Sequence, residues 1–564
     1  MESTKVNCRL QASSPSTKLK KDNSTLFIKT IFKLPAPVPK WPPGTSFASG
    51  IIDLGALHVS QTTSFEKVWA TYEGGLDNQG ATFYEPSSIP EGFFMLGCYS
   101  QPNNQSLFGW VLVAKDVSSP GDPPGLTLPI DYTLVWSSES PKIKQDDVGY
   151  FWLPVPPDGY TSVGHIVTTS PQKPSLDKVR VVRSVLTESA ETDTWIWGAN
   201  SGFNVYSLRP VERGSKALGL SVGTFIAKKD GEEMTLSGLK NLNLSYPSMP
   251  NLDQVQALIQ AYAPVVYLHP DEKYFPSSVS WFFQNGALLY TKGQESNPVQ
   301  IAQDGSNLPQ NGSNDGTYWI DLPTDKNASE GLQKGNLQSA EAYVHIKPAL
   351  GGTFTDIAVW IFCPFNGPGK IKIAFFTISL GEIGEHVSDW EHVTLRVSNF
   401  NGELQSVYYS AHSKGMWVSA PNLEFENNNK PIVYASLYGH ASYPHAGTFI
   451  HDVPQPEKII IGARNDTSKS NFKMDTAAQF SLVGADYLGG LGIVEPPWLN
   501  YAREWGPKRE LDLDKRLKDI EKVLPGKLKD VFDRFVRSLP PEALGQEGPT
   551  GPKWKDNWSG DERD

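Results

Sequence analysis

Cysteine is scarce in this chain of 564 residues. The three cysteines, Cys8, Cys98 and Cys363, are far apart and form no Cys-x-x-Cys motif. Neither a disulfide framework nor a thiolate zinc site is therefore expected. This usage favours a reducing compartment such as the cytosol.

Long apolar runs and an excess of positive charge are also missing. No run approaches the length of a membrane span, and the N-terminus has no apolar segment typical of a secretory signal. The formal net charge is −11, so nucleic acid is not expected as the main partner, because phosphates are bound by basic surfaces. Residues 1–24 are rich in Ser, Thr and Lys, which fits a disordered leader or a transit peptide.

Helical periodicity is rare, whereas aromatic residues and turn formers are abundant. The chain has 16 Trp, 21 Tyr, 26 Phe, 49 Gly and 44 Pro. This composition predicts a mostly β fold with many turns. The length exceeds that of one ordinary core, so we expect two or three domains.

An internal repeat occupies residues 45–230. Each unit has a Trp among β-forming residues, an aromatic residue close to a proline, two glycines five apart, and a further strand. The tryptophans are Trp69, Trp136 and Trp197, and the glycine pairs are Gly92 and Gly97, Gly159 and Gly164, and Gly214 and Gly219. Units this small cannot bury their own apolar faces. The repeat predicts a β-prism, three sheets around a pseudo-threefold axis lined by tryptophan, which serves either as a binding module or as a scaffold.

The stretch from Glu385 to His392 concentrates two histidines, three carboxylates and a tryptophan. It leads into an alternating apolar strand, so Asp389 and Glu391 share the side of Val393, Leu395 and Val397. Carboxylates at the end of a buried face require a partner. That partner is either a Lys or Arg side chain or a bound cation.

Histidines cluster around this strand. Six of the ten histidines lie between residues 386 and 451: His386, His392, His412, His440, His445 and His451. This clustering favours a polar or metal site. A set of Asp389, Glu391 and one or two histidines suits Mg²⁺, Mn²⁺ or Ca²⁺ better than zinc. The chain has neither Gly-x-Ser-x-Gly nor His-Glu-x-x-His.

The remaining segments complete the predicted domain organisation. We expect a leader and Pro-rich linker at 1–44, a linker at 231–253, and a second β domain at 254–508. Asn251 is predicted to cap a helix that buries Val255, Leu258, Ile259 and Tyr262. Residues 509–539 have helical periodicity with a polar face of mixed sign, which favours docking on a domain over lying on a membrane. Residues 540–564 have the composition of a disordered tail.

From Phe32 onward the chain resembles the plant family of vacuolar protein sorting-associated protein 62. Four stretches carry this resemblance: Trp69–Gly75, Pro90–Gly97, Pro174–Lys178 and Tyr262–Pro270. The resemblance implies a link to vacuolar protein sorting.

The second domain also resembles the necrosis- and ethylene-inducing cytolysins, whose Gly-His-Arg-His-Asp-Trp-Glu motif lies on a β-sandwich. The resemblance implies that His386, Asp389 and Glu391 bind a divalent cation around the shared Trp390. Ser388 replaces the family's second histidine, and Asn366 takes the place of its upstream metal-binding aspartate. In those cytolysins the metal site helps to bind plant sphingolipid head groups.

These observations predict a non-enzymatic protein that binds membrane lipid or glycan head groups in vacuolar or endosomal sorting, with trafficking proteins as further partners. It is expected to be cytoplasmic and peripheral on endosomal or vacuolar membranes. The predicted cation ligands are His386, Asp389, Glu391 and Asn366, and Trp390, His392, His412 and His440 are predicted to surround them or touch the head group. Two alternatives stay open: a metal-dependent hydrolase using the same site, with His412 or His440 as general base, and a scaffold without a ligand.

Overall fold

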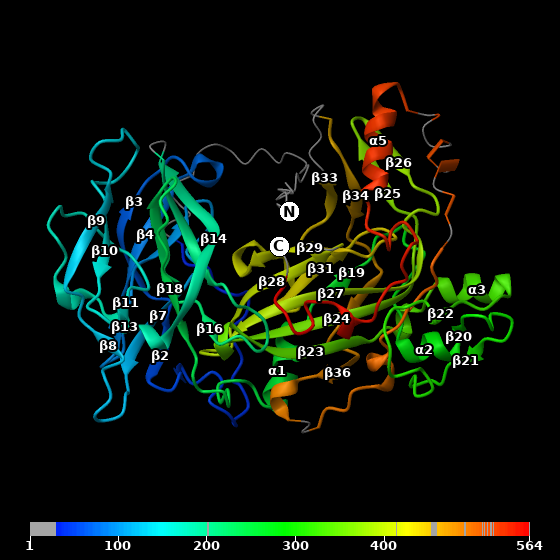
Figure 1. Ribbon diagram of the computed structural model, residues 1–564, viewed down its shortest axis with the longest axis horizontal. Coiled ribbons are helices and arrows are strands. Elements are labelled where there is room, and N and C mark those ends of the chain that lie inside the picture. Colours follow the sequence, from blue (N-terminus) through cyan, green and yellow to red (C-terminus); the bar gives the residue numbers. More distant parts are fainter. Residues whose placement is uncertain are drawn as a thin grey trace.

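The computed structural model describes residues 30–199, 202–412, 414–452, 459–489, 492–509 and 511–562, the last range with gaps at 513, 516, 519–521 and 523. Strands dominate, as the composition predicted, and most of them pair antiparallel. Figure 1 shows two parts side by side, an N-terminal part in blue and cyan and a larger C-terminal part in green to red.

The N-terminal part is built from short antiparallel sheets that follow the repeat. The first two sheets have the orders β1 (Ile51–Asp53), β2 (Leu57–Thr62), β7 (Val111–Asp116), β5 (Phe94–Met95), and β3 (Phe65–Ala70), β4 (Ala81–Pro86), β6 (Tyr99–Pro102). The next two have the orders β12 (Ile166–Thr168), β10 (Tyr150–Val155), β9 (Asp131–Ser137), and β11 (Tyr160–Thr161), β13 (Val181–Arg183), β8 (Leu126–Thr127). The fifth sheet has the order β16 (Gly219–Leu220), β18 (Ser237–Lys240), β14 (Thr187–Ala199), β15 (Phe203–Pro210), β17 (Phe225–Lys229).

The three repeat tryptophans meet in one core. The ring of Trp197 lies 5.7 Å from that of Trp69 and 5.8 Å from that of Trp136, and the rings of Trp69 and Trp136 are 6.4 Å apart. Phe83 and Phe151 fill the space beside them. Each unit thus contributes one large ring to a shared core, because none has enough apolar surface to form a core alone.

Two of the repeat glycines touch where the units meet. A Cβ on Gly164 would lie 2.8 Å from Thr224 and 3.1 Å from the Cα of Gly97. In the third unit Thr224 therefore occupies the position that the spacing assigned to Gly219. Gly219 itself lies in β16 against Pro210.

We expect Gly164→Ala to lower the free energy of unfolding by roughly 1–3 kcal/mol, because the added methyl overpacks this junction. The matched control is Gly331→Ala in helix α3 (Lys326–Gln333), where nothing lies within 4 Å of the new Cβ. The control is expected to be neutral or stabilising, since alanine is the better helix former. Chemical denaturation measures both, and equal effects would contradict the close approach.

The C-terminal part contains a long six-stranded sheet with smaller sheets around it. The six-stranded sheet has the order β29 (Lys414–Ser419), β28 (Leu404–Ala411), β27 (His386–Ser398), β24 (Phe354–Asn366), β23 (Ala342–Ala349) and β36 (Phe480–Gly484). A second sheet has the order β30 (Phe425–Glu426), β31 (Lys430–Ala435), β19 (Val265–Tyr267) and β35 (Lys473–Asp475), with β32 (Ser442–Tyr443) beside β31. Two further sheets have the orders β26 (Phe376–Ser379), β25 (Lys370–Ile373), β34 (Ile461–Thr467), β33 (Gly447–Asp452), and β21 (Val299–Gln300), β20 (Leu288–Thr291), β22 (Tyr318–Asp321). The described residues include the α-helices α1 (Leu252–Tyr262), α2 (Val279–Gln284), α3 and α5 (Lys527–Arg537).

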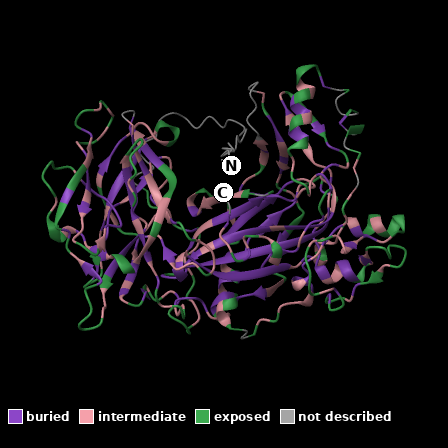
Figure 2. Ribbon diagram, in the orientation of Figure 1, coloured by how far each residue is buried: buried purple, intermediate pink, exposed green. Residues whose placement is uncertain are grey.

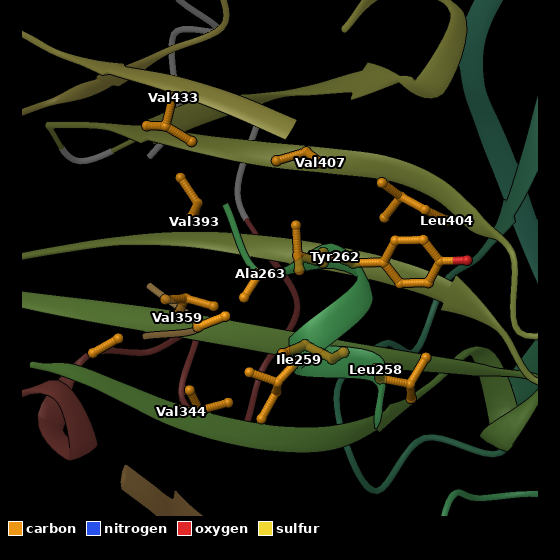
Figure 3. Close-up of a cluster of buried hydrophobic side chains, with 14 of the residues drawn as sticks. Leu258, Ile259, Tyr262, Ala263, Val344, Val359, Val393, Leu404, Val407 and Val433 are labelled. Atoms are coloured by element: carbon orange, nitrogen blue, oxygen red, sulfur yellow. The ribbon is translucent and has the colours of Figure 1, made fainter. Parts of the chain in front are cut away.

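One face of the six-stranded sheet packs against α1 and the sheet containing β19 and β31. Asn251 caps α1 through a capping box with Gln254, as predicted. The helix presents Leu258, Ile259 and Tyr262 to the apolar side chains of the sheet, as Figure 3 shows. The long strands of the sheet are buried almost throughout (Figure 2), so both faces are covered.

Several predicted boundaries differ from the structure. Strand β18 lies within the predicted linker 231–253 and pairs with β14, so the N-terminal part extends to Lys240. The Pro-rich segment is extended, but from residue 30 onward it docks on the C-terminal part: Ala36 exchanges two hydrogen bonds with the side chain of Asn429, and Trp41 packs against Tyr262. Proline excluded helix there, but its composition did not reveal this docking. Residues 1–29 lie outside the described residues.

The C-terminal tail, predicted to be disordered, is anchored up to Glu562. Lys347 donates to the carbonyls of Asn557 and Gly560, and the ring of Trp558 stacks on that of His345 at 3.9 Å. Polar and charged composition is typical of disorder, but here the charges of the tail match buried partners on the sheet.

Helix α5 lies inside the predicted helical stretch 509–539. It buries Val531, Phe532, Phe535 and Val536 against β25 and β34, so it docks on the protein through its apolar face. Residues 510, 513, 516, 519–521 and 523 of the same stretch lie outside the described residues. Within the described chain, we find no helix that combines the length and apolar character needed to cross a bilayer.

Candidate functional site: a buried carboxylate and imidazole cluster

The candidate site lies where β27 begins, beside the end of β24. Asp389 pairs with Cys363 across the two strands, and Glu391 pairs with Ile361. Ile361 belongs to the core that also contains Val393, Leu395 and Val397. The strand parity predicted from the sequence therefore holds: both carboxylates lie at the end of this apolar face.

His440 is the partner of Asp389. It follows β31 in a turn, and its Nδ1 lies 2.8 Å from Asp389 Oδ2, while its Nε2 lies 2.8 Å from the carbonyl oxygen of Tyr274. Both ring nitrogens face acceptors, so both donate and the imidazole is cationic. Burial would lower the pKa of His440, but the adjacent Cys363, the contact with Asp389 and the charge of Glu272 raise it well above its usual value. The same contact outweighs burial at Asp389 and lowers the pKa of that carboxyl.

Glu272 completes the cluster, and the sequence analysis missed it. One oxygen of its buried carboxylate accepts from the backbone N–H groups of Lys273 and Tyr274 at 2.9 Å. The other oxygen accepts from the N–H of Tyr438 at 2.8 Å. Glu272 thus fastens the turn after β19 to the turn that carries His440. It lies in an irregular turn, where no periodicity distinguishes a buried acid from an exposed one.

Glu391 lies at the partly exposed edge of the cluster. Burial and the neighbouring Asp389 carboxylate raise its pKa to about 8, so Glu391 is mainly protonated at neutral pH. The Ser410 hydroxyl lies 3.0 Å from Glu391 Oε2 and 2.6 Å from the carbonyl of His392. A hydroxyl has one hydrogen, so Ser410 can donate to only one of these two oxygens at a time, and it accepts from the N–H of His392.

His386 and Asn366 lie side by side where β27 begins and β24 ends, because they are paired residues of these two strands. His386 Nδ1 donates to the carbonyl of Ser388 at 2.9 Å. The amide nitrogen of Asn366 donates to the carbonyls of Gly384 and Gly367. Both residues are partly exposed.

Three predicted residues do not join this cluster. Trp390 and His392 point to the opposite face of the sheet, where Trp390 packs among Tyr343, Trp498 and Trp505, and His392 bonds Glu562. Side chains alternate along a strand, so neighbours of Asp389 and Glu391 must face away from them. His412 bonds the side chain of Asn465 and lies beside His451, in a group of its own around Tyr443.

The arrangement does not fit a preformed metal centre. Among the described residues, no group of three or more His, Cys, Asp or Glu side chains could hold a metal ion. Asp389 is engaged by His440 and Glu391 by Ser410, and a cation would compete with protonated His440 for the Asp389 carboxylate. The predicted Mg²⁺, Mn²⁺ or Ca²⁺ therefore stays a prediction, and we derive no chemistry from it.

The fold and the site define a mostly β protein of two parts, with a buried aspartate–imidazolium pair beneath a protonated glutamate. The family model described as "Vacuolar protein sorting-associated protein 62" matches residues 28–562. The chain therefore belongs to the vacuolar protein sorting-associated protein 62 family.

Two yeast proteins are among its relatives. Vacuolar protein sorting-associated protein 62 of Saccharomyces cerevisiae is 26% identical over 224 residues, which cover 34% of this chain and 46% of that protein. Putative vacuolar protein sorting-associated protein TDA6 of the same yeast is 24% identical over 270 residues, which cover 40% of this chain and 54% of that protein. The chain spans about half the length of the curated relatives it matches.

Solved structures give only weak similarities. GNIP1Aa from Chromobacterium piscinae matches with a TM-score of 0.28 and 15% identity, over 37% of this chain and 40% of that chain. Necrosis and Ethylene inducing Protein 2 from the causal agent of cocoa's Witches Broom disease matches with a TM-score of 0.19 and 14% identity, over 41% and 74%. NLPPya in complex with mannosamine matches with a TM-score of 0.19 and 14% identity, over 34% and 68%. These similarities are too weak to support an inference about this chain.

Proposed function

We propose that this protein binds membrane lipid or glycan head groups as a peripheral component of vacuolar or endosomal protein sorting. Membership in the vacuolar protein sorting-associated protein 62 family supports the sorting role. The proposal places head-group binding at the partly exposed residues His386, Asn366 and Glu391, near the Asp389–His440 pair. Its location would be cytoplasmic, on the surface of endosomal or vacuolar membranes.

The observation that carries this proposal is the chemistry of the partly exposed residues at the candidate site. Glu391, whose pKa burial and the Asp389 carboxylate raise to about 8, and His386 both present polar atoms at partly exposed positions. Donors and acceptors held by a rigid sheet suit a hydroxyl-rich or phosphate-bearing head group. The buried ion pair below them holds the strand ends together and has no exposed charge of its own.

A hydrolase is the second candidate, because Asp389 and Glu391 are neighbouring carboxyl groups with pKa values shifted in opposite directions. Such pairs supply an acid and a base in many hydrolases. His440 does not suit the role of general base, since both of its ring nitrogens already donate to oxygen acceptors. We favour binding because His440, the histidine that contacts Asp389, has both ring nitrogens engaged.

Substitutions of Glu391 separate the two candidates. Glu391→Gln keeps the size and neutral charge, so binding to glycosylceramide-containing vesicles or a glycan array should change by less than threefold. Glu391→Ala and His386→Ala should each weaken binding about tenfold, as expected for a lost hydrogen bond at a desolvated site. His58→Ala, at a partly exposed histidine in β2, is the control. Turnover of a glycoside or phosphodiester abolished by Glu391→Gln would instead favour the hydrolase, because an amide cannot transfer the proton.

The divalent cation is tested separately, by elemental analysis of the purified protein and by thermal denaturation with and without EDTA. A stoichiometric metal that is lost together with head-group binding in Asp389→Ala would support the cation. Absence of metal, with binding unaffected by EDTA, would remove it from the proposal. Absence of both metal and head-group binding would leave the scaffold alternative.

We also propose the finer architecture predicted from the sequence, a β-prism at the N-terminal end and a β-sandwich in the second part. The mutual contacts of Trp69, Trp136 and Trp197 support the prism. The packing of the six-stranded sheet against the sheet of β19 and β31 supports the sandwich. An experimental structure of the full chain tests both.

A further inference from the structure

The turn between β25 and β26 carries two adjacent aromatic side chains into solvent. Phe375 is 94% exposed and Phe376 is 39% exposed, and Ile460 beside them is 46% exposed. Single exposed apolar residues are common on proteins, but neighbouring exposed apolar side chains mark contact sites. Phe375 has the highest exposure of the large apolar side chains among the described residues.

The turn is held in place by its surroundings. Lys372 Nζ donates to the carbonyl of Phe375 at 3.2 Å, and the N–H of Ala374 donates to the carbonyl of Ile460 at 2.8 Å. Below the turn, Ile371 and Ile373 are buried in the core shared with α5. The hairpin is therefore an anchored element that presents its two phenylalanines outward.

Basic side chains accompany the aromatic turn. Helix α5 packs beside β25 and β34, as Figure 1 also shows, and its apolar face is turned inward. Its sequence contains four basic and two acidic residues in a chain whose net charge is −11, and one of the basic residues, Arg537, pairs with Asp533 of the helix and with Asp514. Apolar rings that insert and cations that attract phosphates are the two features that hold proteins on anionic bilayers.

We infer that the β25–β26 hairpin inserts Phe375 and Phe376 into the interface of an anionic membrane, with Lys372 and the basic face of α5 lying against the lipid phosphates. This inference rests on the proposed membrane function and names its contact surface. The hairpin follows β24 and precedes β27, the two strands that carry the candidate site. Insertion would therefore hold the site close to the lipid surface, where two contacts on one chain reinforce each other.

Vesicle sedimentation tests this inference on the full chain, with phosphatidylcholine vesicles that contain or lack phosphatidylserine. Phe375→Ser with Phe376→Ser should weaken binding to the phosphatidylserine vesicles by roughly tenfold or more, since burying a phenylalanine ring is worth at least that factor. Added salt should weaken binding of the unmodified protein, because anionic lipid is part of the contact. Both rings are exposed, so the midpoint of thermal unfolding should not change.

The matched control is a second pair of exposed apolar residues in the N-terminal part, Val185→Ser with Ile130→Ser, which are 68% and 62% exposed. This control should bind like the unmodified protein. Equal binding by the hairpin variant and the control would overturn the hairpin inference and leave the proposed function standing. If the unmodified protein does not bind these vesicles but binds glycosylceramide vesicles or the glycan array, only the hairpin inference falls; if it binds none of them, both fall. Binding to a protein partner that is lost in the hairpin variant would overturn the membrane inference and assign the turn to that partner.

Discussion

Trp197→Ala is expected to lower the free energy of unfolding by about 3–5 kcal/mol, the range for removing a large buried aromatic side chain. Trp197 has no exposed surface, and its ring contacts Trp69, Trp136 and Phe203. Its indole N–H also donates to the carbonyl of Glu73 at 2.9 Å. Alanine would leave a cavity where all three units meet, together with an unpaired carbonyl.

The matched control is Trp195→Ala, two residues away on the same strand. Trp195 is 36% exposed, and its indole N–H bonds the side chain of Asn204. It should lose much less stability than Trp197→Ala, within about 1 kcal/mol for a partly exposed side chain. Urea denaturation followed by near-ultraviolet circular dichroism measures both variants. Similar losses would contradict a central position for Trp197.

Glu562→Gln is expected to lower the free energy of unfolding by about 3 kcal/mol at pH 7. The Glu562 carboxylate is buried, and it accepts from Thr394 Oγ1 at 2.5 Å and from His392 Nε2 at 3.0 Å, with Lys347 Nζ at 3.8 Å. Burial alone would raise its pKa, but the charge and hydrogen bond of His392, then Lys347 and Thr394, lower it to about 2. Glutamine would leave Lys347 buried without its counter-charge.

The loss in Glu562→Gln should depend on pH in a defined direction. A carboxyl whose pKa is lowered by folding contributes its full stability above its unfolded pKa of about 4.5, and that stability disappears as pH falls toward 2. The difference between the variant and the unmodified protein should thus be largest at pH 7 and smaller at pH 3. Exposed Glu547→Gln serves as the control and should change little. A difference that is constant with pH would contradict an ionised Glu562.

Much of the β architecture was predictable because it depends on local pattern. Alternating apolar residues located β27 and its buried face, and the repeated Trp marked the strands whose rings meet in the N-terminal core. The capping residue Asn251 and the apolar stripe of α1 were also predictable, since capping and helical periodicity are local. The fixed spacing of the repeat selected Gly219 as the last glycine of the third unit. In the structure, Thr224 and not Gly219 contacts Gly97 and Gly164 where the units meet, and spacing alone cannot reveal this.

The candidate site was predictable only in part. The alternation of side chains along β27 placed Asp389 and Glu391 on one face. The same alternation puts His392 on the opposite face. The sequence analysis included His392 because it counted histidines that are close in sequence without considering which face they occupy. Glu272 was missed because it lies in a turn and acts through backbone N–H groups of Lys273, Tyr274 and Tyr438. Partners contributed by separate loops have no shared sequence pattern.

By itself the sequence determined the strand-rich class, the threefold repeat, the family and the face of β27 on which the carboxylates lie. All of these follow from residues close together in the chain or from the repetition of a pattern. The tertiary structure alone decided that His440 is the cationic partner of Asp389, that Glu391 is mainly protonated, and that the acidic C-terminal tail is anchored at Lys347 and His392. Burial and the contacts of distant residues set these charges, because the energy of a charge depends on the side chains around it in space.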